Sequence, residues 1–297
     1  MFYNIQDLIE QSKNYSSVGE LMIETEIKIT GRSREEIIQL MENNLKVMKD
    51  SILEGLKGNP SVTGLTGGDG KKLNEQIARG TFLSGETILK AVRNGIAINE
   101  VNAQMGLICA TPTAGSAGCV PGVLVAVTEK LGLSHQEQLE FLFAAGAFGL
   151  IIANNATISG AEGGCQAEVG SAAAMASAAL VLANGGTVEE AAHGLAITLN
   201  NTLGLICDPV AGLVEVPCIH RNALGASLAF ISADMALAGI KSVIPPDEVI
   251  VCMYQVGRAM PGAFKETAEG GLAATPTGKK LMEEILHARE QNFSSSR

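Results

Sequence analysis

The stretch GAEGGCQAEVGSAAAMASAALVLANGG, residues 160–186, decides how this chain folds. Its first part, 160–170, is rich in glycine around Cys165, and this composition predicts a loop. Its second part, 172–183, is mostly alanine, the residue with the highest helix propensity, so we expect a buried helix there. Asn184 and the two glycines after it end that helix. The stretch therefore predicts close-packed helices joined to a glycine-rich loop that carries a cysteine.

Outside this stretch, the clearest signals are three capping boxes, Ser/Thr-x-x-Glu patterns whose side chains bond the backbone of the first helical turn. They begin at Ser33, Ser134 and Thr187, and predict helices that start at 34, 135 and 188. Further helices are expected over 82–94, 222–237, 248–260 and 278–297. We expect loops over 61–72 and 205–220, a loop or broken helix over 111–122, and a short strand as a possibility over 21–29. The predicted fold class is mainly α, a compact multi-helix domain with glycine-rich loops converging on one site.

Composition indicates one domain. The chain has 297 residues, of which 34 are glycine and none is tryptophan. Small residues let helices approach closely, and no segment has the composition of a disordered linker. We expect a single domain over 1–297, with an N-terminal helical layer over 1–60, a core carrying the site over 61–275 and a C-terminal tail over 276–297.

Charge and hydropathy exclude several classes of protein. The net charge of −10 disfavours binding to nucleic acid, which needs clustered Lys and Arg. The N-terminus lacks the basic and apolar regions of a signal peptide. The longest apolar stretches, 141–153 and 172–183, are shorter than the roughly 18 residues that span a bilayer. We therefore expect a soluble, cytoplasmic protein that binds neither nucleic acid nor a membrane, with cysteines that are thiols or metal ligands rather than disulfides.

Three of the six cysteines, Cys165, Cys207 and Cys218, are expected in loops, and each has glycine or proline within two residues. The other three, Cys109, Cys119 and Cys252, are expected to be small buried hydrophobic residues, a role that cysteine commonly takes. No C-x-x-C pair occurs, which argues against a zinc ribbon or a thioredoxin-like motif. Three thiolates from separate loops could hold three irons of a 4Fe–4S cluster and leave the fourth iron open as a Lewis acid.

Two glycine-rich segments offer N–H and hydroxyl groups that suit an anion such as a substrate carboxylate. Their candidate binding residues are Thr66, Gly67 and Gly68 in the first segment, and Thr113, Ser116 and Gly118 in the second. Ordinary turns are the alternative interpretation. Neither segment matches G-x-x-x-x-G-K-[ST] or a strand–G-x-G-x-x-G–helix unit, so a nucleotide site is not expected.

Charged residues lie close in sequence to the cysteines or to glycine-rich segments, and they could move a proton or orient a ligand. They are Glu162, Glu168, Asp208, His220, Arg221, Lys265 and Glu266. For each, a surface ion pair is the alternative. As general base we consider Lys265, Asp69 and His220, in that order, and Lys265 would need burial to lower its pKa.

Several motifs together resemble a known family. Gly164-Cys165-Gln166-Ala167-Glu168-Val169-Gly170, Cys207-Asp208-Pro209-Val210-Ala211-Gly212 and Val216-Pro217-Cys218-Ile219 look like the signature of iron–sulfur-dependent L-serine dehydratases. Thr66-Gly67-Gly68-Asp69, Pro112-Thr113-Ala114-Gly115 and Glu266-Thr267 resemble further segments, in collinear order over about 62–273. The resemblance is closest to the α chain of the two-chain bacterial form.

This resemblance implies a 4Fe–4S enzyme, an L-serine ammonia-lyase that converts L-serine to pyruvate and ammonia without pyridoxal phosphate. It places the cluster on Cys165, Cys207 and Cys218, and implies a partner β chain and an oligomeric enzyme. Single-chain members end in a cysteine thought to cover the open iron, whereas this chain has no cysteine after Cys252. Many members also carry an acidic residue where this chain has His220.

Three alternatives stay open. A pyridoxal-phosphate dehydratase would need a Schiff-base lysine, for which Lys90 and Lys265 are candidates. A non-enzymatic subunit would use the cysteines only to stabilise its fold, and a fourth protein ligand would favour that interpretation. A dehydratase acting on L-threonine or another small hydroxy amino acid would use the same chemistry on a different substrate.

Overall fold

The structure is a computed structural model that describes residues 1–295, with side chains described for residues 1–288. Its helices are α1 (Ile5–Ser12), α2 (Val18–Thr30), α3 (Arg34–Gly55), α4 (Asp69–Ala78), α5 (Glu86–Ala103), α6 (Cys119–Leu131), α7 (His135–Asn155), α8 (Gly160–Gly163), α9 (Ser171–Ala183), α10 (Val188–Thr202), α11 (Cys218–Leu237), α12 (Pro246–Ala259) and α13 (Pro276–Ser295). Four short helical turns, η1 (Gln166–Gly170), η2 (Val210–Gly212), η3 (Gly262–Phe264) and η4 (Gly271–Ala274), join them. Over 1–295 the only β-type pairing is one isolated bridge, so the prediction of a mainly α fold is confirmed.

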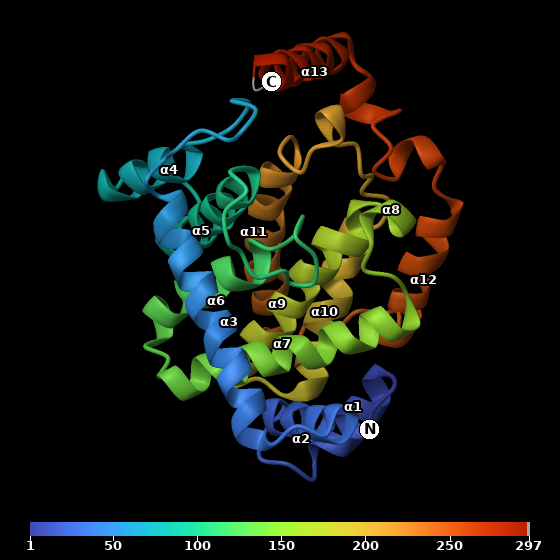
Figure 1. The fold of residues 1–297 in the computed structure, drawn as a ribbon. Helices are drawn as coiled ribbons and strands as arrows, with labels where there is room; N and C mark the ends of the chain where they lie inside the picture. Colours follow the sequence, from blue (N-terminus) through green and yellow to red (C-terminus); the bar gives the residue numbers. More distant parts are fainter. Residues whose placement is uncertain (296–297) are drawn as a thin grey trace.

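Helix α9 lies at the centre of the molecule (Figure 1), where it packs against α6, α7, α10 and α11. Every residue from Ser171 to Val181 is buried, because alanine side chains let the neighbouring helices approach closely. The helical run from Gln166 to Ala183 is long and apolar enough to cross a membrane, with a mean hydropathy of 1.3 over 18 residues. However, 89% of this run is buried inside the fold, as in the core helix of a globular protein.

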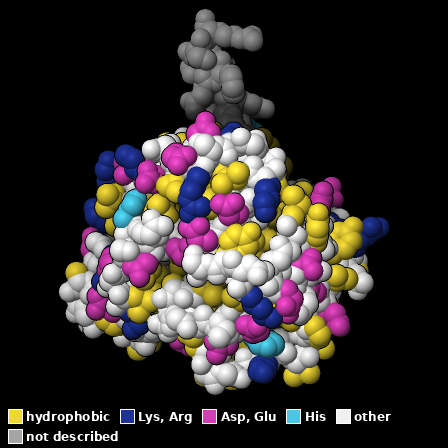
Figure 2. Space-filling model, turned by 90° about the horizontal axis from the view of Figure 1, so that it is seen from below, with side chains coloured by type: hydrophobic (Ala, Val, Ile, Leu, Met, Phe, Trp, Pro, Cys, Tyr) yellow, Lys and Arg dark blue, Asp and Glu magenta, His cyan; other side chains and the backbone are white. Residues whose placement is uncertain are grey.

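The N-terminal helices cover one end of this core, where α2 packs on α7 and α3 packs on α5. One continuous hydrophobic cluster extends from Phe2 in this layer to Met253 in α12. The division of the chain at residues 60 and 275 stays a prediction. On the face nearest α1 and α2, acidic, basic and apolar side chains are intermingled (Figure 2).

The three helices predicted from capping boxes are confirmed, and both hydrogen bonds of each box are present. The possible strand over 21–29 was wrong, because this segment lies in α2, where the Ser17 hydroxyl caps the first turn. The predicted end of a helix at Gly95 was also wrong, since α5 continues to Ala103. A Cβ at Gly95 would lie 3.3 Å from the Gly118 carbonyl oxygen, so this glycine serves close packing and not helix termination.

Three predicted loops contain helix. Residues 160–170 form α8 and the π-helical turn η1, which runs directly into α9. The predicted irregular segment 205–220 ends early, because α11 begins at Cys218. The predicted loop 61–72 likewise ends at Asp69, the first residue of α4. Helix starts therefore carry several residues that the sequence placed in loops.

Candidate metal centre

The three predicted ligand cysteines lie on three different elements and are all buried. Cys165 precedes η1, Cys207 forms the isolated bridge with Lys265, and Cys218 is the first residue of α11. Their exposed fractions are 2%, 2% and 6%. Only Cys207 lies in non-helical sequence, so the prediction of three loop cysteines was wrong for the other two. Because Cys165 and Cys218 are buried at helix starts, the backbone that carries these two sulfurs has a fixed geometry.

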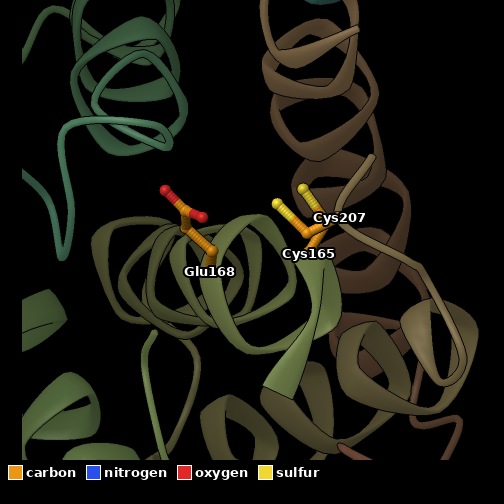
Figure 3. A group of neighbouring side chains, drawn as sticks. All are labelled: Cys165, Glu168 and Cys207. Carbon is orange, nitrogen blue, oxygen red and sulfur yellow. The ribbon is translucent and has the colours of Figure 1, made fainter. Parts of the chain in front are cut away.

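The sulfur atoms of Cys165 and Cys207 and a carboxylate oxygen of Glu168 lie within 4.8 Å of one another. Figure 3 shows the three side chains projecting toward the same space from neighbouring elements. The Cys218 sulfur is outside this tight group, but it is close enough for the Cys165 thiolate to affect its pKa. Donor atoms this close could hold a metal ion, and Cys218 offers a third thiol at the edge of the group.

Hydrogen bonds between backbone and amide groups hold Cys165 and Cys207 together. The Cys207 N–H donates to the Phe264 carbonyl at 2.8 Å, and the Glu266 N–H donates to the Cys207 carbonyl at 2.8 Å. The buried amide of Gln166 donates to the Met253 carbonyl and accepts from the Gly204 N–H, both at 2.9 Å. The segments 165–166, 204–207 and 264–266 are therefore fixed relative to one another.

Arg221 supplies positive charge to the sulfurs. Its guanidinium donates to an Asp208 carboxylate oxygen at 2.6 Å and to the Ile206 carbonyl at 2.7 Å. A hydrogen bond between the two thiols, together with Arg221, lowers the pKa of Cys165, while the same hydrogen bond and burial raise the pKa of Cys207. Burial also raises the pKa of the Cys218 thiol. Cys165 is thus the thiol that deprotonates first.

Two carboxylates border the sulfurs. Glu168 is 8% exposed, and its Oε1 accepts a hydrogen bond from the Thr113 hydroxyl. Burial raises the pKa of Glu168, and the nearby Glu266 carboxylate adds to this rise. A Cβ built on Gly160 would lie 2.5 Å from Glu168 Oε2, 3.2 Å from Cys207 Sγ and 3.5 Å from Glu266 Oε2. Both carboxylates therefore face the same space beside Cys207.

Asn222 ties the segment 111–118 to this centre. Its fully buried side chain donates to the carbonyls of Gly115 at 2.7 Å and Cys218 at 2.9 Å, and accepts from the Gly118 N–H at 3.0 Å. The Ser116 hydroxyl lies 3.1 Å from that of Thr113. Of the predicted substrate residues in this segment, Thr113 thus contacts Glu168, Ser116 contacts Thr113, and Gly118 is engaged by Asn222.

The other predicted substrate segment is bound to buried carboxylates. The Thr66 hydroxyl donates to Glu215 Oε2 at 2.8 Å, so this segment contacts the chain between Cys207 and Cys218. Gly67 and Gly68 have positive φ values of 129° and 87° and lead into α4. The first N–H groups of α4 donate to Glu100 Oε1 and Oε2 at 2.7 and 3.2 Å. Sequence reasoning missed both Glu100 and Glu215. Glu100 lies near no motif cysteine, whereas Glu215 is only three residues before Cys218, and this closeness is the signal that could have found it.

The three predicted proton acceptors lie in different surroundings. Lys265 is half-buried and pairs with Cys207 through the bridge. Asp69 forms an ion pair with Lys72 at 2.8 Å, and His220 is exposed at the start of α11. Lys90, a candidate for a Schiff base, is held by Glu86 and Glu129. Of these four residues, only Lys265 forms a backbone bridge with a predicted ligand cysteine.

The donor set tests whether a metal group fits here. Soft thiolates select zinc, copper(I) or iron–sulfur clusters over hard cations such as magnesium. Three buried thiols and one guanidinium converge in this centre, and glycines at 115 and 160 leave room beside the carboxylates. An iron–sulfur cluster fits these residues. Fold and site together define a class of helical proteins with a buried, cysteine-rich centre that can bind metal and is bordered by acidic groups.

Comparison with known proteins narrows this class. A family model described as "Serine dehydratase alpha chain" matches residues 13–273. The chain is 58% identical over 287 residues to the "Probable L-serine dehydratase, alpha chain" of Bacillus subtilis, which covers 96% of each chain. It is 46% identical over 271 residues to the "L-serine dehydratase, alpha chain" of Peptoniphilus asaccharolyticus, covering 91% of this chain and 92% of that one. The chain belongs to the serine dehydratase alpha-chain family, as its motifs predicted.

A longer relative is also similar. The "L-serine dehydratase" of Haemophilus influenzae is 34% identical over 280 residues, which is 92% of this chain but 61% of that protein. The longer protein therefore contains a sizeable part that lies outside the region it shares with this chain.

Proposed function

We propose that this chain is the catalytic α chain of an enzyme that dehydrates and deaminates L-serine to pyruvate and ammonia. The observation that carries the proposal is the convergence of Cys165, Cys207 and Cys218 at one buried centre beside two carboxylates. The names of the relatives at 58% and 46% identity support the substrate. The proposed cofactor is a 4Fe–4S cluster bound by these three cysteines, without pyridoxal phosphate.

Such a cluster, when bound through three cysteines, would supply a Lewis-acidic iron with an open position. The chain's own residues set the conditions around it. Arg221 compensates the negative charge of the thiolates, and Asp208 fixes the guanidinium from its other side. Gly115 and Gly160 keep the space beside Glu168 free of side chains, because a Cβ at either position would collide with its carboxylate.

The reaction must remove the Cα proton of L-serine and expel the β-hydroxyl, and the resulting aminoacrylate becomes an imine that water hydrolyses. Lys265 remains our first candidate for the proton acceptor, because its bridge with Cys207 places it next to the centre. Asp69 and His220 remain weaker candidates, since Asp69 pairs with Lys72 and His220 is exposed. In this role Lys265 would have to be neutral when it accepts the proton.

The two glycine-rich segments are proposed to bind the substrate carboxylate. The hydroxyls of Thr66 and Thr113 already donate to Glu215 and Glu168, so their contribution would be to hold the segments in place. Backbone N–H groups near Gly67, Gly68 and Ser116 would then meet the substrate.

We further propose a β-chain partner, an oligomeric enzyme and a cytoplasmic location. The words "alpha chain" in the relatives' names support the partner, as does the extra length of the longer relative.

The test begins with anaerobic reconstitution of the chain together with its β partner. We expect close to four irons and four sulfides per α chain, an absorption spectrum bleached by air, and formation of pyruvate from L-serine. L-threonine assayed in parallel measures the substrate preference. Cys165→Ser, Cys207→Ser and Cys218→Ser should each lose iron and activity.

Cys109→Ser is the matched control, because Cys109 packs at the edge of the main hydrophobic core rather than among the other cysteines. It should retain iron. Full activity in any one of the three cluster variants, or bound zinc without sulfide in the wild type, would refute the proposed cofactor and its role.

A further inference from the structure

The carboxylates of Glu168 and Glu266 form a feature that the cluster proposal does not use. Both approach the space next to Gly160. A Cβ built on Gly160 would lie 2.5 Å from Glu168 Oε2 and 3.5 Å from Glu266 Oε2. The same Cβ would lie 3.2 Å from Cys207 Sγ. Two carboxylates and a sulfur therefore line one side of the centre.

The second oxygen of the Glu168 carboxylate, Oε2, lies in this space. Thr113 bonds only Oε1, and Oε2 accepts no hydrogen bond from the described residues. The residue as a whole is 8% exposed. An oxygen with unused acceptor capacity on a largely buried side chain favours a ligand that can donate a hydrogen bond.

No basic side chain compensates the two charges. Within residues 1–288, no Lys, Arg or His lies at ion-pair distance from Glu168 or Glu266, and Arg221 is already paired with Asp208. Two neighbouring carboxylates repel each other when both are charged, and either protonation of one or a cation between them relieves this repulsion. A cationic group on a ligand would therefore suit the space between them.

We propose that Glu168 and Glu266 bind the α-ammonium group of the substrate and select amino acids over hydroxy acids that lack it. This inference rests on the proposed function. An ammonium group has three N–H donors, enough to bond both carboxylates at once. Its place beside Cys207 would leave the carboxylate and hydroxyl of the substrate free to face the rest of the centre.

The structure fixes the Glu168 carboxylate and the backbone of Glu266 before any ligand binds. Glu266 has a φ of 63°, an unusual value for a residue other than glycine, and its N–H is bonded to Cys207. Glu168 is held by Thr113 and lies against Gly115, where a Cβ would be 2.0 Å from Oε1. The space for the ammonium group thus depends on two glycines and one strained residue.

The experiment compares two ligands that differ only in the ammonium group, L-serine and 3-hydroxypropanoate. Each is titrated into the cluster-loaded α–β enzyme, and its dissociation constant is read from the change in the cluster's absorption or electron paramagnetic resonance spectrum. KM and kcat for L-serine are measured in parallel. Glu266→Gln is the main variant because Glu266 is exposed and its substitution leaves the core unchanged.

We expect Glu266→Gln to weaken L-serine binding at least about 10-fold, the effect of losing one charge-assisted hydrogen bond, and to change 3-hydroxypropanoate binding by less than about 2-fold. Glu168→Gln, which still accepts from Thr113, should behave alike, and Glu266→Asp should recover part of the affinity. Glu189→Gln, an exposed change of the same charge in the first turn of α10, should alter neither ligand.

Equal weakening of both ligands, or an unchanged affinity for L-serine, would overturn the inference. Loss of iron from Glu266→Gln would also overturn it, in favour of a structural role. These results differ from a failure of the proposed function itself, in which the wild-type enzyme would neither respond to L-serine nor form pyruvate.

Discussion

Asn222 is the residue whose loss should most directly separate the cysteine centre from the segment 111–118. Its amide bonds two backbone groups of that segment, the Gly115 carbonyl and the Gly118 N–H, and one at the start of α11, the Cys218 carbonyl. Replacing Asn222 by Ala removes all three contacts without introducing a new group. The position is fully buried, so water cannot replace them.

The cost follows from the groups left behind. The Cys218 carbonyl keeps its bond within α11, but the Gly115 carbonyl and the Gly118 N–H lose the partner that Asn222 provided. A buried polar group left without a partner costs about 1–3 kcal/mol. Asn222→Ala should therefore lower the free energy of unfolding by roughly 2–6 kcal/mol.

Urea unfolding followed by circular dichroism measures this change, with iron and sulfide content determined on the same samples. We expect Asn222→Ala to have a lower urea midpoint than the wild type and to lose the proposed cluster faster in air. The reason is that the segment 111–118 is no longer tied to α11, so Thr113 no longer holds Glu168 beside the sulfurs. Asn43→Ala, at an exposed site on α3, should change stability by less than about 0.5 kcal/mol. A midpoint for Asn222→Ala equal to that of the wild type would refute the assigned role.

Three further predictions concern buried charge and close packing. Burial raises the pKa of Glu100 above its ordinary value of 4.5. The wild-type protein should therefore lose stability relative to Glu100→Gln as the pH rises above 4.5. Urea titrations of both proteins over this pH range measure the difference in the free energy of unfolding. Arg221→Met leaves Asp208, which is 2% exposed, without its cation, so the free energy of unfolding should fall by about 3 kcal/mol or more. Adding Asp208→Asn to the same chain should restore part of this loss. Full independence of the two changes in a double-mutant cycle would contradict the pairing. Gly118→Ala should destabilise the protein by about 1–3 kcal/mol, because its Cβ would lie 2.3 Å from a carbonyl oxygen of α5. Gly146→Ala, with open space around it, should stabilise the protein by about 0.5–1 kcal/mol. Equal thermal midpoints for the two variants would show that α5 moves aside without a loss of stability.

The sequence predicted the helices well where a local signal sets their start. Capping boxes work because the hydrogen bonds join residues three positions apart, so the pattern is visible in the chain itself. The prediction failed at Cys165 and Cys218, where neighbouring Gly and Pro were taken as signs of a loop. Pro217 immediately precedes α11, a position that proline tolerates because the first N–H groups of a helix have no partner within it.

The residues that the sequence could not provide are those whose partners lie far along the chain. Thr66 and Glu215 are 149 positions apart, and Asn222 and Gly115 are 107 apart. No local pattern links such pairs, since each residue alone is equally suited to a surface. Cys165, Cys207 and Cys218 could be proposed as ligands because their motifs are specific, whereas the polar residues that hold their surroundings became visible only through tertiary contacts.

The backbone around the cysteines carries strain that also leaves no mark in the sequence. Ala211, Glu266 and Ala268 have φ values of 56°, 63° and 59°, although glycine would adopt this conformation at no steric cost. Such residues cost about 1–3 kcal/mol each and persist only where the surrounding structure fixes them. Here the bonds of the Cys207–Lys265 bridge, and the Asp208 carboxylate that accepts the Leu272 N–H at 2.6 Å, supply that constraint. Three of the four non-glycine residues with positive φ in the described part of the chain thus lie close in sequence to Cys207 or its bridge partner Lys265, where the position of Glu266 relative to the sulfurs matters. The fourth, Met105, lies in the exposed turn that follows α5.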